Sequence, residues 1–161
     1  MTVGEFLLCV KDAAGKDPKC RGTEPASAED RTAGTVCTDW TAGEDFGSCT
    51  EVLLRKNCAR ILHRYLQKVA GVKDLSTGLP SYEEVRDIYD CRICAPHISQ
   101  ILARGIMETY TRGDIQLFEG NREVSRDDAI EYIRRTLHVQ DEYERGLSHF
   151  GSRSYQGGKE N

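Results

Sequence analysis

The segment over residues 52–70 (VLLRKNCARILHRYLQKVA) is the feature that most limits the possible folds of this chain. Its apolar residues recur every three or four positions, which places them on one stripe of an α-helix. The members of this stripe are Leu54, Cys58, Ile61, Leu62, Tyr65, Leu66 and Val69. The opposite face is basic and is predicted to be solvated; it carries Arg55, Lys56, Arg60, Arg64 and Lys68. We expect this helix to lie in a central helical bundle.

Three further helices follow from caps and periodicity. Thr2 is a good N-cap for a helix over about 2–14, and Pro96 suits the first turn of another helix. Ser125 caps a helix over about 125–142, whose first turn is acidic and therefore complements the helix dipole. Two sets of apolar residues are predicted to be buried on the last two helices: Ile98, Ile101, Leu102 and Ile106, and Ala129, Ile130, Ile133 and Leu137.

The remaining segments are polar connections. Residues 15–50 carry one short predicted helix, at about 26–34, and residues 110–124 are predicted to be a polar turn region. Residues 143–161 are predicted to form a polar, disordered tail. The predicted fold class is therefore mainly α, with long polar loops.

Length and charge exclude several classes of protein. The 161 residues suit one domain. With 22 basic and 26 acidic residues, the net charge of −4 argues against nucleic-acid binding, which usually requires a basic excess. No stretch reaches the roughly 18 consecutive apolar residues of a membrane helix. The N-terminal sequence MTVGEFLLCVKDAAG lacks the basic region and the cleavage site of a signal peptide. We expect neither nucleic-acid binding nor membrane insertion.

The starts of the three long helices align with one another as an internal repeat. Each opening residue, which is Thr2, Leu54 or Ser125, is followed three positions later by a polar residue. Small or apolar residues then continue on the same stripe. The alignment predicts three related helical units.

An aromatic residue precedes two of these starts at a nearly constant distance. Phe46 lies nine residues ahead of Arg55, and Phe118 lies eight residues ahead of Arg126. The pattern resembles the S-layer homology (SLH) domain, whose repeat runs F-x-D-V, a short helix ending in G-I or G-V, a turn with F-x-P-x-x-x-I, and T-R-A-E at the start of a longer helix. The best copy consists of residues 82–87, Gly105–Ile106, Phe118, Val124 and residues 125–128.

The resemblance implies a fold and a function. SLH triplets form a pseudo-threefold spindle with the long helices at its centre, and residues 1–142 would form such a module. Grooves between the three prongs bind secondary cell-wall polysaccharide, which commonly bears a ketal-pyruvate carboxylate. The resemblance therefore implies a non-catalytic module that anchors a protein to a bacterial cell surface.

The resemblance also implies the ligand-binding residues. Arg55 and Arg126 match the arginine of T-R-A-E, whereas Val3 stands at the corresponding position of the first repeat. A guanidinium beside free backbone N–H groups at a helix start suits a carboxylate, and Asp or Asn side chains can bind sugar hydroxyls. A tryptophan can stack on the apolar face of a sugar ring. The predicted ligand-binding residues are Glu5, Trp40, Arg55, Asn57, Arg126 and Asp128.

The seven cysteines add a competing signal. Their odd number excludes a closed disulfide framework. Cys91, Cys94 and His97 have the spacing C-x2-C-x2-H, which could supply three zinc ligands, with His63 or Cys58 as a fourth. At a helix start the same cysteine pair could instead be a redox dithiol, a local disulfide or two structural thiols. Beyond this zinc alternative, no metal and no cofactor are expected.

Catalytic motifs are absent from the sequence. There is no G-x-S-x-G, no phosphate-binding glycine loop and no H-E-x-x-H, and the four histidines are scattered. We therefore expect a protein that is not an enzyme. Two alternatives stay open: an SLH-like scaffold that binds other surface proteins, and a cytosolic Cys/His metal or redox protein, which the cysteine count and the plain N-terminus favour.

Overall fold

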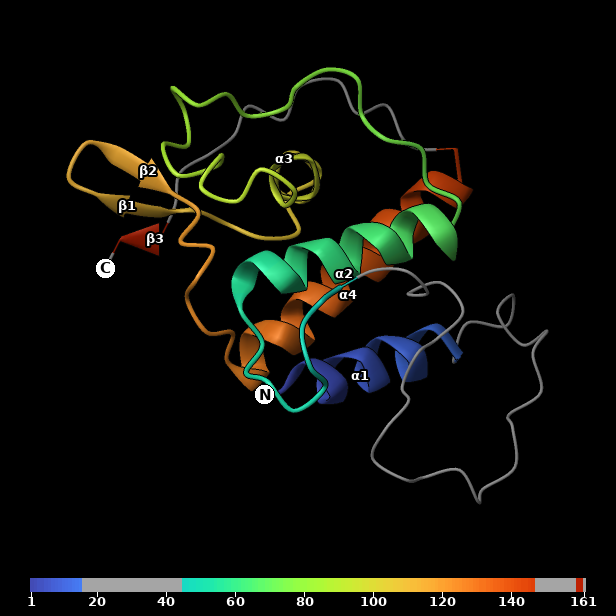
Figure 1. Cartoon of the computed structure of the whole chain (residues 1–161). Helices are drawn as coiled ribbons and strands as arrows, with labels where there is room; N and C mark the ends of the chain where they lie inside the picture. Colours follow the sequence, from blue (N-terminus) through green and yellow to red (C-terminus); the bar gives the residue numbers. More distant parts are fainter. Residues whose placement is uncertain (16–44, 147–158, 161) are drawn as a thin grey trace.

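The computed structural model describes residues 1–15, 45–146 and 159–160 (Figure 1). Within these ranges lie four helices, α1 (Val3–Gly15), α2 (Arg55–Lys68), α3 (Ala95–Ala103) and α4 (Arg126–Glu144). Three short strands accompany them, β1 (Tyr110–Arg112), β2 (Ile115–Leu117) and β3 (Lys159–Glu160). The mainly α fold class is confirmed. The helix predicted over 26–34 and Trp40 lie outside the described residues.

Helix α2 lies at the centre of the molecule. It contacts α1, α3 and α4, while α1 and α4 also contact each other (Figure 1). Five of the seven residues of the apolar stripe predicted for α2 are buried, with Cys58, Ile61, Leu62 and Leu66 fully inaccessible, and Leu54 and Val69 are half-buried. The four residues predicted to be buried after Pro96 are buried too, namely Ile98, Ile101, Leu102 and Ile106. No helix in the described ranges has the length and apolarity needed to span a membrane.

Helix α4 begins where its cap predicts, and Ala129 and Ile133 are buried as predicted. The Ser125 side chain accepts a hydrogen bond from the Asp128 amide at 3.1 Å. Ile130, which was predicted to be buried, is 54% exposed, whereas Tyr132 and Thr136 are buried. Because α1 and α2 both pack on α4, its covered face is turned away from Ile130.

The prediction of a solvated basic face on α2 is wrong for two of its arginines. Arg55 and Arg60 are buried. The Arg60 guanidinium donates to the Asp45 carbonyl at 2.6 Å and lies over the Phe46 ring, 5.2 Å from its centroid. A helix at the centre of a bundle is covered on several faces, so its charged side chains must find partners inside the protein.

The segment predicted as a polar turn region contains a β-hairpin. Strands β1 and β2 pair antiparallel, and a two-residue loop, Gly113–Asp114, joins them. Gly113 has φ of 61°, a backbone conformation that glycine adopts without steric cost. Strand β3 pairs with β1 in parallel, and α4 continues to Glu144. The helix therefore ends two residues later than predicted, and the disorder of the tail stays a prediction. Residues 147–158 and 161 of that tail lie outside the described ranges.

Candidate ligand-binding site

The short segments that precede α1, α2 and α4 cross one another. The Leu53 amide donates to the Met1 carbonyl at 3.0 Å, and the Val124 amide donates to the Leu53 carbonyl at 2.9 Å. Each of these three residues stands two positions before its helix. The starts of three helices that are far apart in the sequence are therefore tied together through the segment before α2.

At the start of α1, the first backbone amides are already bonded to a loop. Val3 N–H donates to the Glu51 carbonyl at 2.9 Å, and Gly4 N–H donates to the Cys49 carbonyl at 3.0 Å. The approach is close, since a Cβ atom on Gly4 would stand 2.9 Å from the Cys49 carbonyl oxygen. Glycine at this position therefore allows the loop to reach the helix start.

The start of α2 repeats this arrangement with another loop. Arg55 N–H donates to the Arg122 carbonyl and Lys56 N–H donates to the Gly120 carbonyl, both at 2.9 Å. The expectation of free backbone N–H groups beside Arg55 is therefore wrong, because loop carbonyls already accept from these amides.

The Arg55 side chain is enclosed as well. It is 1% exposed. Its Nε donates to the Phe118 carbonyl at 2.9 Å, and its terminal nitrogens donate to the hydroxyl groups of Tyr132 at 2.8 Å and Tyr110 at 3.3 Å and to the Glu108 carbonyl. The guanidinium lies 4.7 Å from the centroid of the Phe118 ring, in cation–π contact. This placement contradicts the predicted role of Arg55 as an accessible partner for a ligand carboxylate.

The remaining predicted residues do not form one site. Arg126 is exposed, and its charge helps to lower the pKa of Glu5, a shift caused mainly by the hydrogen bond from the Thr2 amide at 2.8 Å. Asp128 belongs to the cap of α4, where it accepts from the Ser125 hydroxyl at 2.8 Å. Asn57 is half-buried on α2. The structure thus brings Glu5 and Arg126 near each other and separates both from the surroundings of Arg55.

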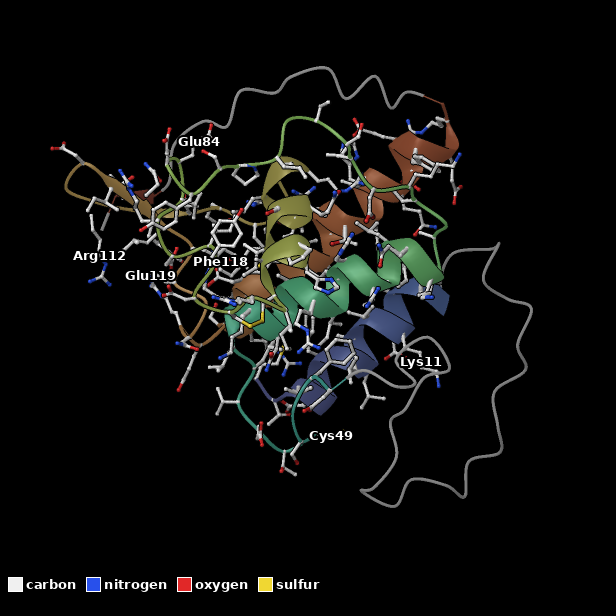
Figure 2. All side chains as sticks on the ribbon, turned by 45° about the horizontal axis from the view of Figure 1, so that its top comes forward. Lys11, Cys49, Glu84, Arg112, Phe118 and Glu119 are labelled. Atoms are coloured by element: carbon white, nitrogen blue, oxygen red, sulfur yellow. A yellow bond between two sulfur atoms is a disulfide. The ribbon has the colours of Figure 1, made fainter. Side chains whose placement is uncertain are left out.

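A cavity of about 590 Å³ lies beside the start of α2. Four segments form it, from α2, from the chain around α3, from β1 and from the loop that follows β2. Figure 2 shows Arg112, Phe118 and Glu119 of its lining, on the opposite side of the molecule from Lys11. The lining residues are Lys56, Asp87, Asp90, Cys91, Ile98, Arg112, Phe118, Glu119, Gly120, Asn121 and Arg122.

Asp87 holds the loop that borders this cavity. Its two carboxylate oxygens accept from the Phe118 amide at 2.6 Å and from the Glu119 amide at 2.7 Å. Glu119 has φ of 56°, which is uncommon for a residue with a side chain. The paired hydrogen bonds from Asp87 stabilise this conformation, because they fix both amides at the strained position.

Glu119 pairs with two of the three cations of the cavity. Its carboxylate pairs with Arg112 at 2.6 Å and with Arg122 at 3.2 Å. Burial would raise the pKa of Glu119, but the hydrogen bonds from these arginines outweigh burial and lower it. Glu119 is therefore ionised at neutral pH, and it offsets one of the two positive charges with which it pairs.

Lys56 is the cavity cation with a neutral partner. Its Nζ donates to the Asn121 side-chain oxygen at 2.6 Å, and in the described part of the chain it forms no ion pair. Asp90 is an exposed carboxylate that also lines the cavity. The cavity therefore offers one ammonium group with capacity for an anion and one carboxylate with capacity for a donor. Sequence reasoning missed this pair, because its members lie far apart along the chain and match no motif.

The C-x2-C pair is a disulfide. Cys91 and Cys94 are bonded to each other, and Figure 2 shows this bond in yellow. Disulfide sulfurs are not the thiolates that zinc requires. His97 is engaged elsewhere, since its Nδ1 lies 2.8 Å from Nδ1 of His63. The alternative zinc set of Cys91, Cys94 and His97 is therefore not assembled here, and no cluster of three candidate metal ligands occurs in the described ranges.

The buried His63 continues this network to the surface. Its Nε2 lies 2.9 Å from a carboxylate oxygen of Asp74, which also accepts from Gln67. Burial lowers the pKa of His63, although Asp74 partly opposes the shift. His63 is therefore neutral at pH 7, and one of the two facing nitrogens of His63 and His97 donates to the other.

Comparisons with protein-family models, with characterised proteins and with solved structures give no match. The functional argument therefore depends on the cavity and on the pattern of the helix starts.

Proposed function

We propose that this protein is a non-catalytic module that binds an anionic cell-wall polysaccharide at a bacterial surface through the cavity beside α2. The observation that carries the proposal is Lys56, an ammonium group with a neutral partner at the edge of a cavity lined by polar and aromatic groups. In this proposal, the anion site implied by the resemblance is moved by one residue, from the enclosed Arg55 to its neighbour.

The helix starts support an SLH-like, pseudo-threefold arrangement as part of this proposal. At α1 and at α2, the first two amides donate to carbonyl groups two residues apart in a following loop, at distances of 2.9–3.0 Å. The two crossing bonds of Leu53 and Val124 also occupy equivalent positions before α2 and α4. Such repetition is expected if the three units share one architecture, as SLH repeats do.

The cavity has the chemistry of a sugar site. Its volume of about 590 Å³ falls within the range usual for small-ligand sites. Lys56 can bind a carboxylate of the polymer, and Asp90 and Asn121 can bind hydroxyl groups. Phe118 and Ile98 are buried and form the apolar floor of the cavity. Lys56 forms no ion pair in the described ranges, so its ammonium group can pair with the carboxylate of an acidic sugar.

The test is retention of the full chain on purified bacterial cell walls, before and after chemical removal of their secondary polymers. We expect retention only on intact walls. Lys56→Gln should weaken binding to the walls roughly tenfold or more, because it removes one charge-assisted hydrogen bond, which contributes about 1.5–3 kcal/mol. Lys11→Gln is the matched control, since it removes an exposed lysine from the far side of the molecule (Figure 2). Equal retention of both variants would contradict the role of Lys56.

A second candidate, binding to another surface protein, is favoured by exposed apolar side chains in the segment over 82–93. Tyr82, Tyr89 and Ile93 are 50%, 58% and 69% exposed, and the two tyrosine rings stack with centroids 6.4 Å apart. Exposed apolar groups gathered in one place are typical of protein interfaces. Retention that survives polymer removal, but is lost in Ile93→Glu and after protease treatment of the walls, would support this candidate instead of the glycan.

A further inference from the structure

The Cys91–Cys94 disulfide differs from a buried cross-link in where its two sulfurs lie. Cys91 is half-buried and lines the cavity, whereas Cys94 is 1% exposed. The pair therefore presents one sulfur to a space that solutes can enter and hides the other sulfur. Thiol–disulfide exchange requires a sulfur that an incoming thiolate can reach, so this asymmetry decides which sulfur is attacked.

The hidden sulfur lies at the start of a helix. Cys94 is the N-cap residue of α3, a helix of nine residues. The amides of Cys94 and Ala95 both donate to the Cys91 carbonyl at 2.9 Å, which closes the two cysteines into a turn at the helix start. The positive end of the helix dipole favours a negative charge at this position, which opposes the cost of burying a Cys94 thiolate.

We propose that Cys91–Cys94 is a thiol–disulfide exchange site for small-molecule thiols that enter the cavity. The thiolate of the small molecule attacks Sγ of Cys91 and forms a mixed disulfide, while the Cys91–Cys94 bond breaks and its electron pair passes to Sγ of Cys94. A second thiolate attacks the sulfur of the small molecule in this mixed disulfide and releases Cys91. Two thiols are thereby oxidised to one small-molecule disulfide, and the cysteine pair takes up two electrons and two protons.

The cavity favours a small thiol over a protein thiol. A space of about 590 Å³ accepts a molecule of the size of a tripeptide or smaller. Asp90 and Lys56 on its walls can bind the ammonium and carboxylate groups that small biological thiols carry. Exchange with a protein would require Cys91 to stand out from the surface, and it is half-buried. This proposal concerns the cysteine pair and does not depend on the binding of a polysaccharide.

The first test is reduction of the native full chain by millimolar reduced glutathione, followed by mass spectrometry of alkylated peptides. We expect both Cys91 and Cys94 to become alkylated without denaturant. Cys49→Ser is the matched control, because it removes an exposed free cysteine remote from the cavity and should leave this reduction unchanged. A pair that stays bonded until the chain unfolds in urea would overturn the proposal. Reduction by a protein dithiol but not by glutathione would overturn the assignment to small thiols.

The second test separates the two sulfurs. In Cys94→Ser, oxidised glutathione should form a mixed disulfide with Cys91 at least about tenfold faster than with Cys94 in Cys91→Ser, since only Cys91 is accessible. Far-UV circular dichroism checks that each variant is folded. Equal rates in two folded variants would show that the cavity does not direct the attack, and would overturn the assignment of Cys91.

Discussion

Arg55 and Arg126 occupy the same position, the first residue of α2 and of α4. One guanidinium is 1% exposed and makes four hydrogen bonds to the protein, and the other lies in solvent. The difference comes from the segment over 118–122, whose carbonyls accept from the side chain of Arg55 and from the start of α2. The same position in a repeated pattern can therefore serve the core in one copy and the surface in another.

The enclosure of Arg55 also explains its partners. A buried guanidinium costs much desolvation free energy unless its N–H groups are paired. Three aromatic residues surround it, of which two, Tyr110 and Tyr132, supply hydroxyl acceptors. Burial raises the pKa of Tyr132, so its hydroxyl stays protonated and neutral beside the arginine. Arg126 has no need of such a set, because water solvates it.

The largest decrease in the free energy of unfolding is expected from replacing the buried Arg55. Arg55→Ala should lower the free energy of unfolding by about 3–5 kcal/mol, because it leaves buried acceptors unpaired and opens a void. Arg126→Ala, the matched surface variant, should change it by less than about 0.5 kcal/mol. Urea denaturation followed by circular dichroism measures both. Similar losses in the two variants would contradict the difference in burial on which the comparison depends.

A smaller decrease in the free energy of unfolding is expected when the loop that covers Arg55 loses its hydrogen bonds to Asp87. Asp87→Ala removes the acceptor of two loop amides and should cost about 2–3 kcal/mol, as expected for hydrogen bonds to a charged group. If Asp87 acts by holding the loop over Arg55, the double variant Arg55→Ala, Asp87→Ala should lose clearly less than the sum of the two single losses. Additive losses would show that the loop and the arginine are stabilised independently.

A buried histidine on α2, His63, and an exposed one on α4, His138, should differ in their effect on the pH dependence of stability. Burial lowers the pKa of His63 below its ordinary 6.5, against the attraction of Asp74, and the positive charges of Arg104 and Arg64 lower it further. The unfolded chain therefore binds a proton near pH 6.5 that the folded chain does not bind. The free energy of unfolding should decrease as the pH falls below about 6.5, by up to about 1.4 kcal/mol per pH unit.

The control for this pH dependence is the exposed histidine of α4. His63→Gln should remove the loss of stability between pH 7 and 5, whereas His138→Gln, at a side chain 60% exposed, should keep it. Asp74 does not contribute in this range: its pKa, which burial alone would raise, is lowered below 3.8 by hydrogen bonds from His63 and Gln67. A pH profile that is unchanged in His63→Gln would contradict the assignment.

The long helices were predictable because their signals are local. The predicted ranges 2–14, 52–70 and 125–142 correspond to the observed helices within about three residues at each end. The stripe of α2 depends on side-chain spacing along one helix, and the cap of α4 depends on Ser125 and Asp128, three residues apart. The β1–β2 hairpin also has a local signal, the Gly113–Asp114 loop, which the description as a turn region did not use.

The site was not predictable to the same extent, because its contacts are not local. The sequence alone shows that Arg55 and Arg126 stand near the starts of two long helices, because the order of residues is enough to align these starts. Which arginine is enclosed depends on Phe118, 63 residues from Arg55, and the cavity at Lys56 depends on Asn121, 65 residues away. Burial and pairing are set by segments that meet only in the folded protein, and these segments make Arg55 a core residue and leave Lys56 with capacity for a ligand.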